Sequence, residues 1–334
     1  MKAVWFLALA ACGSPAQPET SKPTVASALR CTWNDAVVGT AEALQQTWVA
    51  LPATVAHAGV NASGAALIGL DGKPLDPAAA ANPALDRATV INAGPLITGY
   101  FAFVVGTAGG KPTAELARFD AAGGGKAMTA FAPELGAETG KQLLEAGNCF
   151  ALLTEKDVRI ADGHLKPVGA PIAKGVPTRV SRIGGVKSFR IAIQWDATKL
   201  QVFDASNGEP IAEAVDTQHE LVALVPMGDS ALAVAAKQGL LEAALVANDG
   251  KVGAWKTLHE GHRADNLLVG TSPDGRTLIQ FTDDNAYAAE VRSDGSLGPL
   301  SSPGAVDHQS TFGIVAADGI YTQSGPDIRR WACQ

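Results

Sequence analysis

The sequence carries little charge and lacks several motifs that would reveal a chemistry. Only 18% of its 334 residues are charged and the formal net charge is −7, so no basic surface is available to displace counterions from nucleic acid. No two cysteines stand at C-x-x-C spacing, which argues against the common structural zinc sites. No G-x-S-x-G is present, so the chain has no nucleophile elbow. We therefore predict no nucleic-acid partner, no catalytic residue, no metal ligand and no cofactor.

The N-terminal hydrophobic run is too short to cross a membrane. Ala3 to Ala11 form an unbroken apolar segment after Lys2, whereas a membrane-spanning helix needs about 20 apolar residues. A short apolar segment behind a positive charge is typical of a secretory signal. The run ends in Leu9-Ala10-Ala11-Cys12, followed by Gly13. These residues indicate export from the cytoplasm.

This ending resembles the lipobox of bacterial lipoproteins. The resemblance implies cleavage before Cys12, lipidation of Cys12 and, from Gly13, attachment to the outer membrane. Residues 1–11 would then be a signal peptide and residues 12–29, rich in Pro and small polar residues, a lipidated tether. Residues 30–334 would form the globular body. An ordinary secretory signal followed by a chance cysteine is the alternative.

The chain contains a repeat of about 45 residues, a period typical of repeat architectures. An Asp closely followed by Gly recurs after short apolar segments, and between strands such a pair favours a tight hairpin because Gly accepts positive φ. The instances are Asp71-Gly72, Asp120 with Gly123, Asp162-Gly163, Asp204 with Gly208, Asp249-Gly250 and Asp294-Gly295.

A second set of segments recurs with the same spacing as these turns. Short, mostly apolar runs precede most of them, and such runs suit strands whose two faces are both covered. The runs are Phe101 to Val105, Cys149 to Leu153, Phe189 to Ile193, Ala231 to Ala235 and Leu278 to Phe281. We therefore expect a fully buried strand in each repeat.

Residues 272–300 show the repeat unit most clearly. A Ser-Pro-Asp-Gly turn, a strand, a polar turn, a second strand, an Asp-Gly turn and an edge strand follow one another. This unit resembles the blades of bacterial β-propellers of the WD-repeat and Tol-system type. The resemblance implies an all-β fold, and residues 30–334 are long enough for about seven such units.

The last blade is expected to combine both ends of the chain. Phe312 to Ala316 and the segment from Asp327 continue the repeat without a fourth strand, which Cys31 to Trp33 would supply. We thus predict a seven-bladed propeller. Six or eight blades remain alternatives, because residues 76–88 and 132–146 have helical composition and obscure the repeat. Two unrelated β domains are a further alternative.

Three cysteines remain beside Cys12. If both chain ends share one blade, Cys31 and Cys333 lie on neighbouring strands and a disulfide between them would lock the ring. Cys149 would then be a buried free thiol. Pairing of Cys31 with Cys149 is the alternative, since connectivity does not follow from sequence.

Two short clusters have residue types that bind metals, yet we assign no metal to either. In His259-Glu260-Gly261-His262 the glycine favours a loop between blades. Asp283-Asp284-Asn285 offers oxygen ligands suited to calcium, but the same residues are favoured in a tight turn. We interpret both as loop residues.

These observations favour a membrane-anchored envelope lipoprotein that uses its propeller as a binding or scaffolding surface. We expect a monomer that contacts the membrane only through its lipid, with a protein, peptide or cell-wall partner. The alternative is a propeller hydrolase or lactonase-like enzyme, which would need three or more His, Asp, Glu or Asn side chains at the channel mouth. A passive structural surface protein is the third hypothesis.

Overall fold

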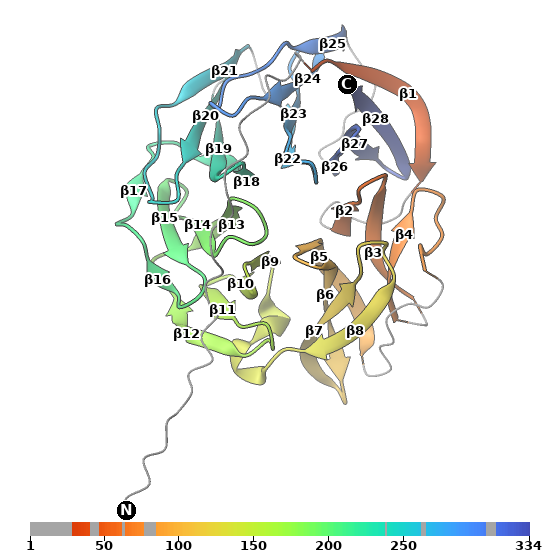
Figure 1. The fold of residues 1–334 in the computed structure, drawn as a ribbon, viewed down its shortest axis with the longest axis vertical. Coiled ribbons are helices and arrows are strands. Elements are labelled where there is room, and N and C mark those ends of the chain that lie inside the picture. Colours follow the sequence, from red (N-terminus) through yellow and green to blue (C-terminus); the bar gives the residue numbers. More distant parts are fainter. Residues whose placement is uncertain are drawn as a thin grey trace, which may run out of the picture.

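The computed structural model describes residues 29–40, 47–61, 64–76, 85–237, 239–261, 265–304 and 312–334. Their strands form seven small antiparallel sheets arranged as a ring (Figure 1). The innermost strands contact one another in the order β2, β5, β9, β13, β18, β22 and β26, and β26 returns to β2. The protein is therefore a seven-bladed β-propeller, as predicted, and the six- and eight-bladed alternatives are wrong.

Each blade is a meander whose first strand lies at the ring centre. Blade 1 contains β2 (Trp48–Ala50), β3 (Val55–Asn61) and β4 (Gly64–Gly69); blade 2 β5 (Asp86–Leu96), β6 (Gly99–Ala108), β7 (Lys111–Phe119) and β8 (Gly125–Ala130); blade 3 β9 (Gln142–Ala146), β10 (Cys149–Leu153), β11 (Val158–Ala161) and β12 (Pro167–Ile172). Blade 4 contains β13 (Pro177–Ile183), β14 (Arg190–Trp195), β15 (Lys199–Asp204), β16 (Glu209–Pro210) and β17 (Val215–Asp216); blade 5 β18 (Leu221–Met227), β19 (Ser230–Lys237), β20 (Leu240–Val246) and β21 (Lys256–Glu260). Blade 6 contains β22 (Asp265–Thr271), β23 (Thr277–Thr282), β24 (Ala286–Val291) and β25 (Ser301–Gly304); blade 7 β26 (Phe312–Ala316), β27 (Gly319–Ser324), β28 (Asp327–Cys333) and β1 (Cys31–Thr40).

The hydrophobic core lies between blades. One cluster of buried side chains joins each adjacent pair around the ring. The second strand of a blade contributes to the clusters on both of its faces, which is why its sequence is apolar without alternation. In β10, for example, all five residues are buried. The short apolar runs found in the sequence lie on these second strands.

In blades 2 to 6 the Asp-Gly pairs lie between the third and fourth strands, as predicted, and Asp71-Gly72 follows the third strand of blade 1. In blade 6, Asp294 Oδ1 accepts hydrogen bonds from the Ser296 backbone N–H and hydroxyl at 3.0 and 2.6 Å. Gly295 occupies positive φ, 81°, which costs a glycine little. The aspartate thus closes the turn from the side chain while the glycine supplies its backbone geometry.

The helical expectation was wrong for most of residues 132–146. Two 3₁₀ turns, η2 (Pro133–Leu135) and η3 (Ala137–Thr139), are followed directly by strand β9. Gly136 stands between the turns in the left-handed region, and extended Gly140 ends the second. In the other segment, residues 77–84 lie outside the described residues, and Asp86 to Ala88 belong to β5. No described helix is long and apolar enough to cross a membrane.

Both chain ends build blade 7, in the order β26, β27, β28, β1. Cys31 and Cys333 are directly opposed across β1 and β28 and form a disulfide, the pairing that we expected. Beside it, Arg30 and Gln334 exchange two backbone hydrogen bonds of 3.0 Å. These contacts close the ring.

Cys149 differs from expectation. It is fully buried at the start of β10, but none of the described cysteines is free. The free-thiol prediction is therefore wrong.

The disulfide should contribute measurably to stability. Its two cysteines are 302 residues apart, and opening such a long loop raises the entropy of the unfolded chain. We expect Cys31→Ser/Cys333→Ser to lower the free energy of unfolding by about 2–4 kcal/mol and the Tm by about 4–8 °C. Thermal melts of the oxidised proteins measure this. Reductant serves as the control, since it should shift wild type further than the variant; equal shifts would contradict a stabilising bond.

Candidate binding site in the central channel

Two cavities lie in the channel, and the larger one is in the ring centre, on one side of the propeller. We call this side the hairpin face, because it carries the connections from first to second strand of every blade. The cavity has a volume of about 800 Å³, within the range of small-molecule sites. Its lining comes from blades 1, 2, 4, 5, 6 and 7. It is thus a product of ring closure and belongs to no single blade.

Glycines keep the mouth of this cavity open. The connections in blades 2, 4, 5 and 6 contribute Gly99, Gly184, Gly228 and Gly275, all at positive φ. At Gly99 the need is also steric, because a Cβ there would meet the Phe119 carbonyl oxygen at 2.1 Å. The tight hairpins therefore present backbone and little side chain to the opening.

The wall is apolar with one charged side chain. Side chains such as Pro226, Leu268 and Ile314 line it, and among the described lining residues only Arg182 of β13 carries charge. Burial lowers the Arg182 pKa to about 10, opposed by the nearby Glu145 charge, so the guanidinium remains cationic at neutral pH. The larger cavity is therefore lined mainly by uncharged residues and has one positive group, the Arg182 guanidinium.

A smaller cavity of about 230 Å³ adjoins the first and contains a carboxyl group. The two cavities share lining residues, among them Arg182 and Pro226, and the smaller one adds Glu145 of β9. Glu145 is only 7% exposed, and its Oε2 accepts a 2.6 Å hydrogen bond from the Ile97 N–H. Arg182 donates to the backbone carbonyl of Glu145 at 3.1 Å. These contacts join blades 2, 3 and 4.

Burial raises the pKa of Glu145 to about 7. The Ile97 N–H and the charges of Arg182 and Arg118 oppose this rise without cancelling it. The carboxyl is therefore partly protonated near neutral pH. Under those conditions it only partly balances the positive charge of Arg182.

A side-chain amide aligns the innermost strands around this site. Asn92 of β5 donates through Nδ2 to the Leu143 carbonyl at 2.8 Å and accepts from the Leu143 N–H at 2.9 Å. The amide satisfies the β9 backbone as a neighbouring strand would, and it is itself buried. It fixes the distance between blades 2 and 3 where the smaller cavity forms.

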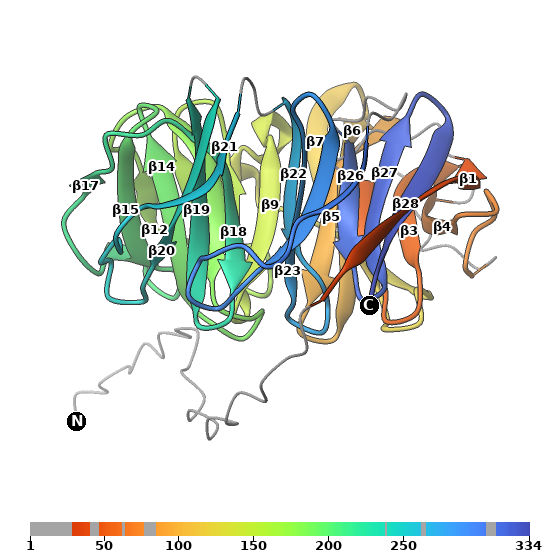
Figure 2. The ribbon, with the colours of Figure 1, turned by 90° about the horizontal axis from the view of Figure 1, so that it is seen from above.

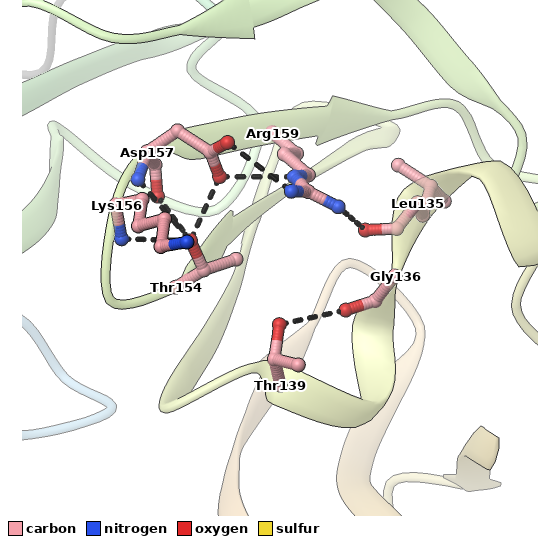
Figure 3. Close-up of polar contacts among 7 residues, drawn as sticks. All are labelled: Leu135, Gly136, Thr139, Thr154, Lys156, Asp157 and Arg159. Atoms are coloured by element: carbon pink, nitrogen blue, oxygen red, sulfur yellow. Dashed lines mark hydrogen bonds and ion pairs between the residues drawn. The ribbon is translucent and has the colours of Figure 1, made fainter. Parts of the chain in front are cut away.

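On the opposite face, polar side chains tie the connections between blades to the blades themselves. In blade 3 the Thr154 hydroxyl bonds Asp157, and Arg159 donates to both Asp157 carboxylate oxygens at 2.9 and 3.2 Å (Figure 3). Arg159 also donates to the Leu135 carbonyl in η2, so a blade turn holds the preceding connection (Figure 3). Gly136 is needed beside it, since a Cβ would lie 2.5 Å from Arg159 Nη1. This network is structural.

The clusters with metal-ligand residue types serve the same purpose. His259 of β21 faces Asp283, in the turn after β23, with 3.1 Å between Nε2 and Oδ2, and it packs against Phe281 and Tyr287. The Asp283 N–H donates to the Asn285 carbonyl, so this segment is a turn, as we interpreted it. His262 lies outside the described residues. His259 and Asp283 thus join blade 5 to blade 6.

The described residues contain no group of three or more His, Cys, Asp or Glu side chains placed to hold a metal. Among the described residues that line the larger cavity Arg182 is the one charged residue, and the smaller cavity adds Asn92 and Glu145. Neither Arg182 nor Glu145 was predicted as a site residue. Glu145 lies in the segment that was expected to be helical, and the strand that carries Arg182 was not among the predicted ones, so no signal in the sequence indicated either residue.

Comparison with known proteins shows the fold. No family model and no curated protein matches this sequence. A chain in the structure titled "Crystal Structure of Mitotic Checkpoint Complex" has a TM-score of 0.61 at 13% identity, covering 99% of this chain and 98% of that one. The structure of BBS1N in complex with ARL6DN has a TM-score of 0.56 at 11% sequence identity, and the WD40 β-propeller domain of Doa1 has a TM-score of 0.53 at 12% identity. Each of these two matches covers 90% of this chain and 96% of the other chain. The chain is thus a seven-bladed propeller with WD40 propellers among its structural neighbours.

Glu145 should make stability depend on pH. Its pKa of about 7 in the folded protein exceeds the ordinary 4.5, so the folded state binds the proton more tightly and loses stability as pH rises from 4.5 through 7. Glu145→Gln, which keeps an acceptor for the Ile97 N–H, removes this titration. We expect wild type to lose up to about 3 kcal/mol relative to the variant between pH 4.5 and 8.

Denaturant unfolding of both proteins across this range measures the effect. Taking the difference between them cancels all other titrating groups. A difference that stays constant with pH would contradict the raised pKa.

Proposed function

We propose that the protein is a lipoprotein of the bacterial cell envelope, anchored in the outer membrane, whose propeller binds a protein, peptide or cell-wall partner. The observation that carries the proposal is the sequence Leu9-Ala10-Ala11-Cys12, directly before a tether-like segment and a closed propeller. Several acyl chains on Cys12, at about 0.8 kcal/mol for each buried CH₂, would hold it at the membrane almost permanently.

The ring-closing disulfide supports an exported protein. Structural disulfides persist in oxidising compartments such as the periplasm and the cell surface and are rare in the cytoplasm. Cys31 and Cys333 are buried and paired as part of blade 7. A bond built into the fold in this way suits a protein that matures outside the cytoplasm.

The rigid ring and its connections support a binding role. Blades that pack on both neighbours hold surface loops in fixed positions, which a binding surface needs and which requires no catalytic group. Two of the structural neighbours were solved in complexes: one in the mitotic checkpoint complex, the other with ARL6DN. Such folds commonly serve as interaction scaffolds, and this supports a partner for the present chain.

Substitution of Cys12 tests the anchor. We expect Cys12→Ser to move the protein from the membrane fraction to the soluble fraction, because the thioether-linked lipid is lost, while Ser14→Ala leaves it in membranes. Fractionation with mass spectrometry of the N-terminal peptide measures both. Retention of Cys12→Ser in membranes would contradict the proposal. So would a peptide with Cys12 in a disulfide, since that sulfur cannot also carry lipid.

Crosslinked affinity capture from the native envelope tests the binding role. Ile97, 40% exposed at the cavity mouth, is a probe of the hairpin face, and Val37, 47% exposed on the outer strand β1, is its matched control. We expect wild type to capture a partner at a near-stoichiometric level. Either Ile97→Glu or the equivalent change on the opposite face, Val176→Glu, should abolish this capture, whereas Val37→Glu should leave it unchanged. Empty captures with several crosslinkers would contradict a scaffold.

A further inference from the structure

Arg182 occupies a position that the fold does not explain. Its side chain lines both channel cavities, and its one hydrogen bond within the described structure goes to the Glu145 backbone carbonyl. None of the ion pairs among the described residues includes Arg182, and the Glu145 charge acts on it only from a longer distance. A guanidinium has five N–H donors, so most of its donor capacity is directed elsewhere.

The nearest buried carboxyl group is already engaged. Glu145 Oε2 accepts a hydrogen bond from the Ile97 N–H of blade 2. Arg182 of blade 4 donates to the backbone carbonyl of Glu145 and not to its carboxylate. Arg182 is only partly buried, so its remaining N–H groups are accessible to a molecule that enters the cavity. An anion entering the cavity would supply the missing partner and could bond two guanidinium N–H groups side by side.

The other residues that line the cavity determine which chemical groups the rest of the anionic molecule can have. The larger cavity holds about 800 Å³, and apart from Arg182 its described lining is uncharged, with apolar side chains and glycine backbone. Apolar walls favour an apolar body, and a single positive side chain favours a single negative group. A strongly hydrated or multiply charged molecule would lose its water without compensation.

We propose that the central channel binds a small organic molecule with an apolar body and one anionic group, which Arg182 holds at the inner end of the cavity. This goes beyond the scaffold role and does not depend on the lipid anchor. A free acyl carboxylate has this chemistry.

The probe pair for the test differs in charge alone. 1-Anilinonaphthalene-8-sulfonate has an apolar ring system and one sulfonate, and N-phenyl-1-naphthylamine has the same rings without it. Fluorescence titration of the purified protein with each probe measures binding. We expect the sulfonate to bind at least 10-fold more tightly than the amine, and decanoate, but not decan-1-ol, to displace it.

Variants on one strand assign the site. Arg182→Gln should weaken sulfonate binding at least 10-fold and leave the amine unchanged, while Arg182→Lys, which keeps the charge, should retain most of the affinity. Arg179→Gln is the matched control, because Arg179 also lies on β13 but lines neither cavity. Circular dichroism melts establish that each variant is folded.

Three results would overturn the proposal. They are absence of sulfonate binding to the wild type, equal binding by Arg182→Gln and Arg179→Gln, and displacement by decanol as effective as by decanoate. If Arg182→Gln fails to fold, Arg182→Lys together with the decanoate and decanol comparison on wild type still decides the question.

Discussion

The pairing of β1 with β28 is the contact on which the rest of the structure depends. A ring of blades has no independent core, since every hydrophobic cluster is shared between two neighbours. If the ring opened at blade 7, the faces of blades 6 and 1 that now pack on it would be exposed together. The Cys31–Cys333 disulfide and the backbone exchange between Arg30 and Gln334 oppose that opening where the two ends meet.

Ring closure also produces two faces that differ in their contacts and in their openness. On the side opposite the hairpins, polar pairs such as Arg159 with Asp157 and His259 with Asp283 hold the connections between blades. The hairpin face has contacts between blades of its own, such as Ile97 with Glu145 and Gly184 with Ser230, while its glycine turns leave the channel open. Both faces are therefore held together across blades, and the hairpin face also leaves space for binding.

The fold was largely predictable because its signals are local. An Asp-Gly turn recurs in blades 1 to 6 and a mostly apolar second strand recurs in most blades, and both follow from interactions within a blade or with its immediate neighbours. The channel site was not predictable in the same way, since Glu145, Ile97 and Arg182 come from three blades and share no spacing in sequence. The 3₁₀ turns before β9 were misjudged because their helical composition is interrupted by Gly136 and Gly140. Cys149 was misjudged because connectivity is a property of the fold alone.

The position of the chain ends has a consequence for orientation. Cys333 lies beside the blade 7 hairpin, where its N–H donates to the Asp318 carbonyl, and Arg30 pairs with Gln334 at the same place. The polypeptide therefore enters the propeller on the hairpin face, the side on which Figure 2 shows the C-terminus. A lipid on Cys12 would draw this side toward the bilayer. The channel would then open to the membrane surface, where amphiphiles concentrate, and the opposite face would point outward to meet other macromolecules.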